Sequence, residues 1–73
     1  MEYNNLLKHL GFHFKLARMK AGLSQGQLAE ILNSHERYIS DIECGKRNIT
    51  IKTIHKFSTA LNVKLPELFE FDK

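Results

Sequence analysis

The sequence predicts an all-α protein whose five helices form a single domain over residues 1–73. Apolar residues recur mainly at intervals of three and four, and β-branched residues do not alternate with polar ones, a pattern typical of helices that bury one face. Pro66 is the only proline, so helices can run uninterrupted through most of the chain. A chain of 73 residues holds one hydrophobic core, because so few apolar residues cannot stabilise two.

The first two predicted helices are separated by Gly22, a residue type that commonly ends helices. The first helix buries a stripe that comprises Leu6 or Leu7, Leu10, Phe14, Ala17 and Ala21. The second begins at Ser24, which forms a capping box with Gln27 because each side chain satisfies the other residue's free amide. Its predicted buried side consists of Leu28, Ala29, Ile31 and Leu32.

A turn at Asn33 and Ser34 leads into the third predicted helix, over residues 35–44. Asn33 tolerates a left-handed backbone, and Ser34 is the expected N-cap of the helix. The residues of this helix that face inward are Ile39 and Ile42. Gly45 supplies the left-handed residue that commonly follows the end of a helix.

The fourth predicted helix begins after Thr50, its expected cap, and ends at Asn62. Its apolar stripe consists of Ile51, Ile54, Phe57 and Leu61. Pro66 suits the first turn of a short fifth helix, because a proline there loses no helical hydrogen bond. This C-terminal helix is predicted over about residues 65–70, and its apolar residues are Leu65, Leu68 and Phe69.

Composition narrows the functional classes. The formal net charge is +3, and the body from Lys8 to Lys56 carries more basic than acidic residues, which favours a polyanionic partner. The single cysteine, Cys44, excludes an intramolecular disulfide and a cysteine-based zinc site. No apolar run approaches the roughly 18 residues that cross a membrane, and residues 1–10 lack the layout of a signal peptide. We therefore expect a cytoplasmic protein.

Several short strings occur in a characteristic order along the chain. Arg18 precedes GLSQGQLA, which is followed by RYISDIE, GKRN and ALNVKLPELF. In this order and spacing they resemble the Cro/repressor-type helix-turn-helix proteins, often called the XRE family, over nearly the whole chain. The string RYISDIECGKRNITIKTI is most similar to the small controller proteins of restriction–modification loci. Two residues depart from the family pattern: Asn33 stands where glycine is common, and Glu36 where controllers often carry a basic residue.

The resemblance implies a compact domain whose helix-turn-helix spans about residues 24–44. It also implies a sequence-specific transcription regulator that binds a palindromic double-stranded DNA operator as a homodimer, without catalytic activity, cofactor or small-molecule ligand. RNA polymerase is a further candidate partner. The alternative is a phage-type repressor, or an antitoxin whose main role is to bind a partner protein, since both share much of the same string.

The third predicted helix offers an outward face suited to the major groove. At 100° per residue, one arc of it carries Glu36, Arg37, Ser40, Asp41 and Cys44. Arg37 is the strongest candidate for reading a base, because its planar guanidinium matches O6 and N7 of guanine. Asp41, four residues further on, either aims Arg37 or only pairs with it on the surface.

Three other residues of this helix are candidate base readers whose roles stay open. Glu36 repels phosphates unless it accepts from a cytosine amine or rests at the N-terminus of its own helix. Ser40 can bond to several bases and discriminates little. Tyr38 lies at the edge of the outward arc, where it either packs on the core or stacks beside the groove.

Contacts to DNA phosphates need donors that flank the groove. The candidates are Gln25, Lys46, Arg47, Asn48 and Thr53. Gln25 matches the family glutamine that grips the DNA backbone, and Thr53 lies near the start of the fourth helix, where free amides favour an anion. Arg18 and Glu43 match a buried ion pair of the family that ties the first helix to the third.

Apolar residues in excess of one core lie at both ends of the chain. Phe12, Leu16 and Met19 form a second stripe on the first helix. The family resemblance implies a two-fold dimer interface, to which we assign the C-terminal residues Leu65, Leu68, Phe69 and Phe71. The other interpretation is that the fifth helix folds back onto the first within one chain. Dimerisation and this packing are compatible.

His9 and His13 have the spacing of two metal ligands on one helical face. No third ligand accompanies them, and no nucleophile–base pattern is present in the sequence. The sequence therefore predicts neither a metal site nor a catalytic site.

Overall fold

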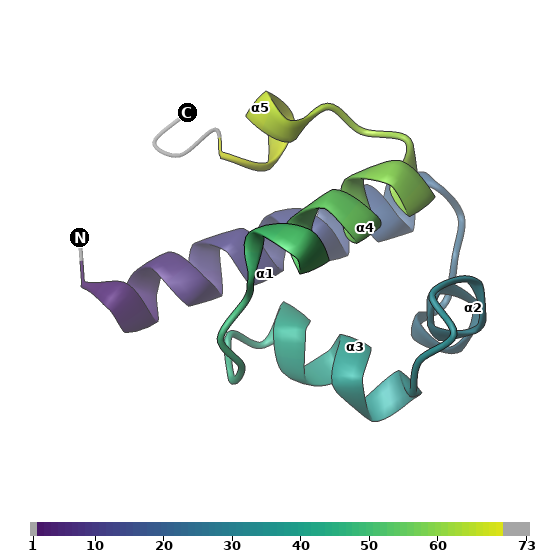
Figure 1. The fold of residues 1–73 in the computed structure, drawn as a ribbon, viewed down its shortest axis with the longest axis horizontal. Coiled ribbons are helices and arrows are strands. Elements are labelled where there is room, and N and C mark those ends of the chain that lie inside the picture. The colour runs from purple at the N-terminus through teal and green to yellow at the C-terminus, as the bar shows by residue number, and fades with distance from the viewer. Residues whose placement is uncertain (1, 70–73) are drawn as a thin grey trace.

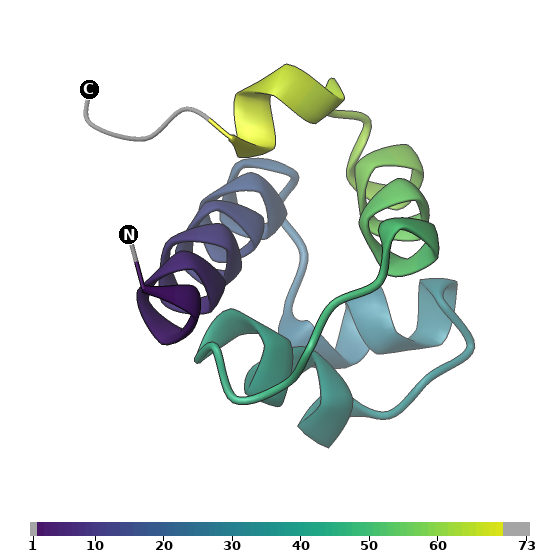
Figure 2. The same cartoon turned by 60° about the vertical axis from the view of Figure 1, so that its left-hand side comes forward.

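The computed structural model describes residues 2–69 and is all-α within them, as predicted. Its helices are α1 (Tyr3–Lys20), α2 (Gln25–Ile31), α3 (Glu36–Glu43), α4 (Ile51–Leu61) and α5 (Leu65–Leu68) (Figure 1). Figure 2 shows α1 and α4 on two sides of the core, with α5 across one end. The short helices α2 and α3 close the other end, so α3 lies on the far side of the core from α5 in both views.

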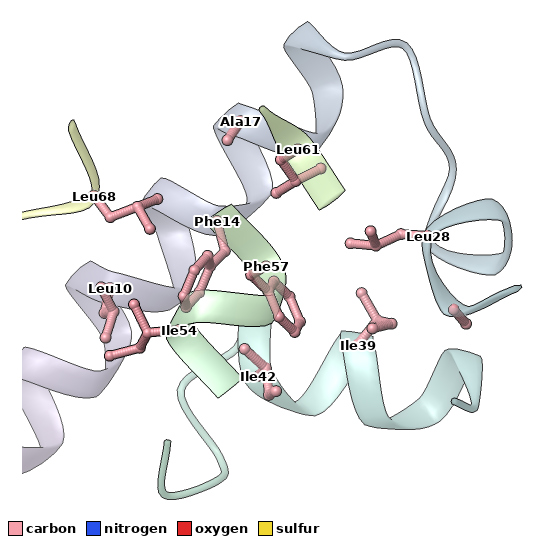
Figure 3. Close-up of a cluster of buried hydrophobic side chains, with 11 residues drawn as sticks. Leu10, Phe14, Ala17, Leu28, Ile39, Ile42, Ile54, Phe57, Leu61 and Leu68 are labelled. Atoms are coloured by element: carbon pink, nitrogen blue, oxygen red, sulfur yellow. The ribbon is translucent and has the colours of Figure 1, made fainter. Parts of the chain in front are cut away.

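The core is built around two phenylalanines that point toward each other from α1 and α4 (Figure 3). The ring centroids of Phe14 and Phe57 are 4.7 Å apart, and both side chains are almost fully buried. Ile39 and Ile42 join this cluster and have no exposed surface. Each such side chain stabilises the fold by roughly 1.5–3 kcal/mol. Because α3 is too short to be stable alone, these contacts hold it in place.

Local capping follows the predictions at three helix ends. The backbone N–H of Gln27 donates to Ser24 Oγ (3.0 Å), and that of Ser24 donates to Gln27 Oε1 (2.8 Å), which completes the capping box. Thr50 Oγ1 accepts from the backbone N–H of Thr53 (3.1 Å) at the start of α4. Asn62 ends α4 with a left-handed backbone, at φ 56°. These caps are confirmed because each one depends only on residues close in sequence.

The turn between α2 and α3 differs from its prediction at one residue. Asn33 is left-handed (φ 53°), as expected. Ser34 is not the N-cap of α3: that position belongs to His35, whose side chain makes no capping hydrogen bond. The backbone N–H of Ser34 instead donates to the carbonyl oxygen of Ala29 (2.8 Å) and closes the end of α2.

Three residues that the sequence predicts to be buried are exposed. Ile31 is 56% exposed because Leu28, Ala29 and Leu32 already cover the side of α2 that meets the core. Ile51 is 79% exposed because α4 begins beyond the edge of the core. Ala21 is exposed because it follows the last residue of α1, where the helical stripe has ended.

The C-terminal helix folds back onto its own chain. Leu68 is 1% exposed and belongs to the same core cluster as Phe14 and Phe57. Its assignment to the dimer interface is therefore wrong, because a side chain buried in one chain has no surface for a second. The helix ends at Leu68, earlier than the predicted residue 70, and Phe71 lies outside the described residues.

One close approach between helices has no counterpart in the predictions. A Cβ atom on Gly11 would collide with the backbone carbonyl oxygens of Ile42 and Glu43. The glycine thus lets α1 pack directly against the C-terminal end of α3. This contact fixes the position of α3 in addition to its own buried side chains.

Candidate nucleic-acid interface

Helix α3 separates its residues into a buried half and an open half. Ile39 and Ile42 face the core, whereas Glu36 and Arg37 are exposed. The Arg37 side chain is 87% exposed and lies in the first turn of the helix. Ser40 and Asp41 are partly exposed on the same open half. The predicted amphipathic arrangement is therefore present, while the contact of each side chain with a base stays a prediction.

Asp41 stands between two arginines. Its Oδ1 is 3.5 Å from Nε of Arg37, four residues earlier on α3. Its Oδ2 is 3.8 Å from Nε of Arg47, which lies in the loop after the helix. The sequence indicated the first of these ion pairs and missed the second, because a loop residue follows no helical spacing.

Tyr38 packs partly on the core, which is one of its two predicted arrangements. It is half-buried against the hydrophobic cluster, and its hydroxyl lies 3.5 Å from Thr53 Oγ1. The guanidinium carbon of Arg47 lies 5.0 Å from the centre of the Tyr38 ring, within the range of a cation–π contact. Arg47 is thus held by a carboxylate and by an aromatic ring together.

The loop at residues 46–48 is supported by the start of α1. The Tyr3 hydroxyl donates a hydrogen bond to Asn48 Oδ1 (2.8 Å) across 45 residues of sequence. At Gly45, a Cβ atom would lie 2.8–2.9 Å from atoms of Lys8, so the glycine lets this loop lie close to α1. Because the amide oxygen of Asn48 accepts from Tyr3, its Nδ2 hydrogens remain as donors. No sequence pattern indicated a role for Tyr3.

A buried network fixes the C-terminal end of α3. Arg18 Nε and Nη2 donate to the two carboxylate oxygens of Glu43, at 2.6 and 3.1 Å. Arg18 Nη1 also donates to the carbonyl oxygen of Leu23 (2.7 Å). Gln25 Nε2 donates to Glu43 Oε1 (3.0 Å) and brings the first turn of α2 into the network. One amide hydrogen of Gln25 is therefore used inside the protein, and its phosphate contact stays a prediction.

Glu36 lies beside the start of α2 as well as in the first turn of α3. A Cβ atom on Gly26 would be 3.4 Å from Glu36 Oε1, so the carboxylate rests against the first turn of α2. Free backbone amides at helix N-termini favour a negative charge there. Glu36 therefore lies at the N-terminus of its own helix, which is one of its two predicted positions, and also beside the N-terminus of α2.

The remaining candidates lie outside this face. Within residues 2–69, no group of three or more His, Cys, Asp or Glu side chains is arranged to hold a metal ion. His9 and His13 lie on α1. No helix in this range is long and apolar enough to cross a membrane.

The short helices α2 and α3 are joined by the four residues 32–35. The apolar half of α3 is anchored in the core, and its polar half is open. This arrangement defines a helix-turn-helix DNA-binding protein. A helix-turn-helix family model matches residues 14–68. The control protein C.BamHI of Bacillus amyloliquefaciens is 39% identical over 69 residues, which cover 93% of this chain and 85% of that protein.

Solved structures agree with this class. The restriction-modification controller protein C.AhdI from Aeromonas hydrophila has a TM-score of 0.80 at 35% identity, over 86% of this chain and 96% of that chain. The hypothetical transcription factor NHTF from Neisseria has a TM-score of 0.82 at 28% identity, over 96% of this chain and 80% of that chain. The chain therefore belongs to the helix-turn-helix family and, within it, to the restriction–modification controller proteins. The resemblance found in the sequence is confirmed.

Proposed function

We propose that the protein regulates a restriction–modification locus by binding, as a homodimer, a DNA operator with two-fold symmetry. The observation that carries this proposal is the open half of α3, where the exposed Arg37 is paired with Asp41 at 3.5 Å. An arginine in the first turn of an anchored helix can reach a base edge in the major groove. The protein performs no catalytic step in this role, and it acts in the cytoplasm, where operator DNA lies.

In the proposed complex, base reading and phosphate contact come from different elements. Arg37 reads a guanine, and its neighbours on the open half of α3 are Glu36, Ser40 and Asp41. Phosphates are contacted from both sides of the groove by Gln25, Lys46, Arg47, Asn48 and Thr53. The backbone N–H of Thr53 already donates to Thr50 Oγ1 (3.1 Å), so its contribution comes from its hydroxyl, which lies within 3.5 Å of those of Tyr38 and Thr50.

Apolar surface on α1 and α5 supports the homodimer. Five large apolar side chains there are 39–57% exposed: Phe12, Leu16, Met19, Leu65 and Phe69. This surface leaves α3 free, because α3 lies at the opposite end of the core from α5 (Figure 2). The chain measures 32 × 22 × 20 Å. Two adjacent copies are thus of a suitable size to place their recognition helices about one DNA turn, roughly 34–36 Å, apart.

The test is a selection of bound duplexes from a random pool by the wild-type protein. The proposal predicts a motif of two inverted half-sites whose centres are about 10 base pairs apart. Sedimentation of the protein with the selected duplex should give two chains per site. An unenriched pool, or one chain on a single half-site, would contradict the proposal.

The dimer has its own test in the free protein. Phe69→Ser removes an apolar side chain that is 44% exposed, so we expect sedimentation to show a shift from dimer to monomer at micromolar concentration. Lys64→Ser, at an exposed polar residue beside α5, is the matched control and should leave the dimer intact. A wild-type protein that stays monomeric at high micromolar concentration would rule out the proposed dimer.

RNA polymerase is the further partner that we propose for a regulator bound beside a promoter.

A further inference from the structure

Asp41 pairs with both arginines that we propose to bind DNA, the base reader Arg37 and the phosphate-binding Arg47. Its two carboxylate oxygens are used separately, Oδ1 for Arg37 at 3.5 Å and Oδ2 for Arg47 at 3.8 Å. The Asp41 side chain is 21% exposed, whereas those of Arg37 and Arg47 are 87% and 50% exposed. A short, partly buried side chain on an anchored helix has few conformations, so Asp41 is the fixed member of this cluster.

The guanidinium groups keep their outer ends available. Both ion pairs use Nε, so the Nη1 and Nη2 end of each arginine remains for another acceptor. For Arg37 that end can bond O6 and N7 of guanine. For Arg47 the same end can bond a phosphate, while the ring of Tyr38 at 5.0 Å restrains the plane of the guanidinium.

We propose that Asp41 is a specificity-determining positioning residue that couples base reading by Arg37 to phosphate contact by Arg47. This inference rests on the proposed function. When Arg47 is present, it holds one oxygen of Asp41 and thereby directs the other oxygen toward Arg37. When Arg47 is absent, the carboxylate can turn, and Arg37 loses its fixed direction. Removal of a phosphate-binding side chain then also weakens the choice of base.

The charge of Asp41 has a separate effect, which does not depend on the DNA sequence. It offsets one of the two positive charges of Arg37 and Arg47, and so it weakens attraction to DNA of any sequence. Correct aim at a base strengthens binding to the operator alone. The charge lowers both affinities alike, so only the aim raises the ratio of operator affinity to random-DNA affinity.

The test uses four full-length chains: wild type, Arg47→Ala, Asp41→Asn and the double variant. Each is titrated, at one salt concentration, with the duplex selected by the wild type and with a copy changed at one base pair. That base pair is the one whose preference disappears in Arg37→Ala. The measured quantity is the discrimination ratio, the Kd for the changed duplex divided by the Kd for the selected one.

In the presence of Asp41, Arg47→Ala should lower the discrimination ratio about two- to five-fold, the size expected of a surface ion pair. In the Asp41→Asn background the same change should leave the ratio unaltered. Asp41→Asn alone should lower the ratio while it strengthens binding to random DNA. Lys46→Ala is the matched control, because it removes a neighbouring charge outside the cluster. It should weaken binding to both duplexes and leave the ratio unchanged.

Equal effects of Arg47→Ala on both duplexes, with and without Asp41, would overturn the coupling. The proposed function would then still stand, since the wild type would still discriminate. A wild type that bound the two duplexes equally would overturn the proposed function together with the coupling.

Discussion

Helix α3 carries two carboxylates that pair with arginine, and they differ mainly in exposure. Glu43 is 2% exposed and lies 2.6 Å from Arg18, which is itself 10% exposed. Asp41, two residues earlier, lies 3.5 Å from Arg37, whose side chain is 87% exposed. The same chemistry therefore occurs once inside the protein and once on its surface.

The comparison shows how burial divides structural from binding roles. A buried charge cannot leave its partner without a large desolvation cost, so the Arg18–Glu43 pair is a permanent part of the scaffold. A surface ion pair contributes about 0–1 kcal/mol, so Arg37 can exchange Asp41 for a DNA base at little cost. The buried pair fixes α3, and in the proposed complex the surface pair leaves Arg37 available to bind a base.

The largest expected effect comes from breaking the buried pair. Arg18→Ala leaves the Glu43 carboxylate buried without its main partner, and should lower the free energy of unfolding by about 3–5 kcal/mol. Denaturation by urea, monitored by circular dichroism, measures this change. Lys15→Ala, at an exposed position of α1, is the control and should stay within about 0.5 kcal/mol. A loss below about 1 kcal/mol for Arg18→Ala would remove the distinction between the two pairs.

Arg47→Ala tests the surface cluster around Asp41. It removes one proposed phosphate-binding side chain per subunit, so it should weaken binding to operator and random DNA. The slope of log Kd against log salt should fall by about one unit for each phosphate that is no longer neutralised. Titrations at several salt concentrations measure the slope. An unchanged slope would show that Arg47 does not contact phosphate.

Tyr3→Phe tests whether the α1 hydroxyl orients Asn48 for binding. Loss of this exposed hydrogen bond should weaken binding to all DNA about two- to five-fold, because Asn48 can then rotate. In an Asn48→Ala background the same substitution should have no further effect. Equal losses in both backgrounds would place the role of Tyr3 elsewhere.

The smallest expected effect is that of Arg37→Ala on stability. Arg37→Ala should change the free energy of unfolding by no more than about 0.5 kcal/mol, because its side chain is 87% exposed and its ion pair is weak. The same urea denaturation experiment measures it. A loss comparable to that of Arg18→Ala would mean that Arg37 is structural.

The sequence predicted the features that depend on neighbouring residues. The capping box of Ser24 and Gln27, the left-handed backbone of Asn33 and the end of α4 at Asn62 each follow from local geometry. The pairing of Arg37 with Asp41 follows from the four-residue spacing on a helix. Family resemblance supplied the pair of Arg18 and Glu43, which lie 25 residues apart.

Other features depend on how the elements meet in space. Periodicity places Ile31 and Ile51 near an apolar stripe, but the width and length of the neighbouring core decide that both are exposed. From sequence alone, an apolar C-terminal helix can pack on its own core or on a partner chain. The prediction of Leu68 at the dimer interface is wrong for this reason, since the side chain lies in the core of its own chain. The contact of Tyr3 with Asn48 arises only when α1 and the loop after α3 are packed together.

The central claim is that Arg37 reads a base in each half-site. The most direct test compares the duplexes that wild type and Arg37→Ala select from one random pool. A bidentate contact contributes roughly 1–3 kcal/mol per site, so a dimer should lose about 30- to 20,000-fold in operator affinity and far less on random DNA. The variant should also lose its preference at one symmetric position of each half-site. If both proteins select the same base at every position, Arg37 is not a reader, and Glu36, Ser40 or Tyr38 must determine the sequence.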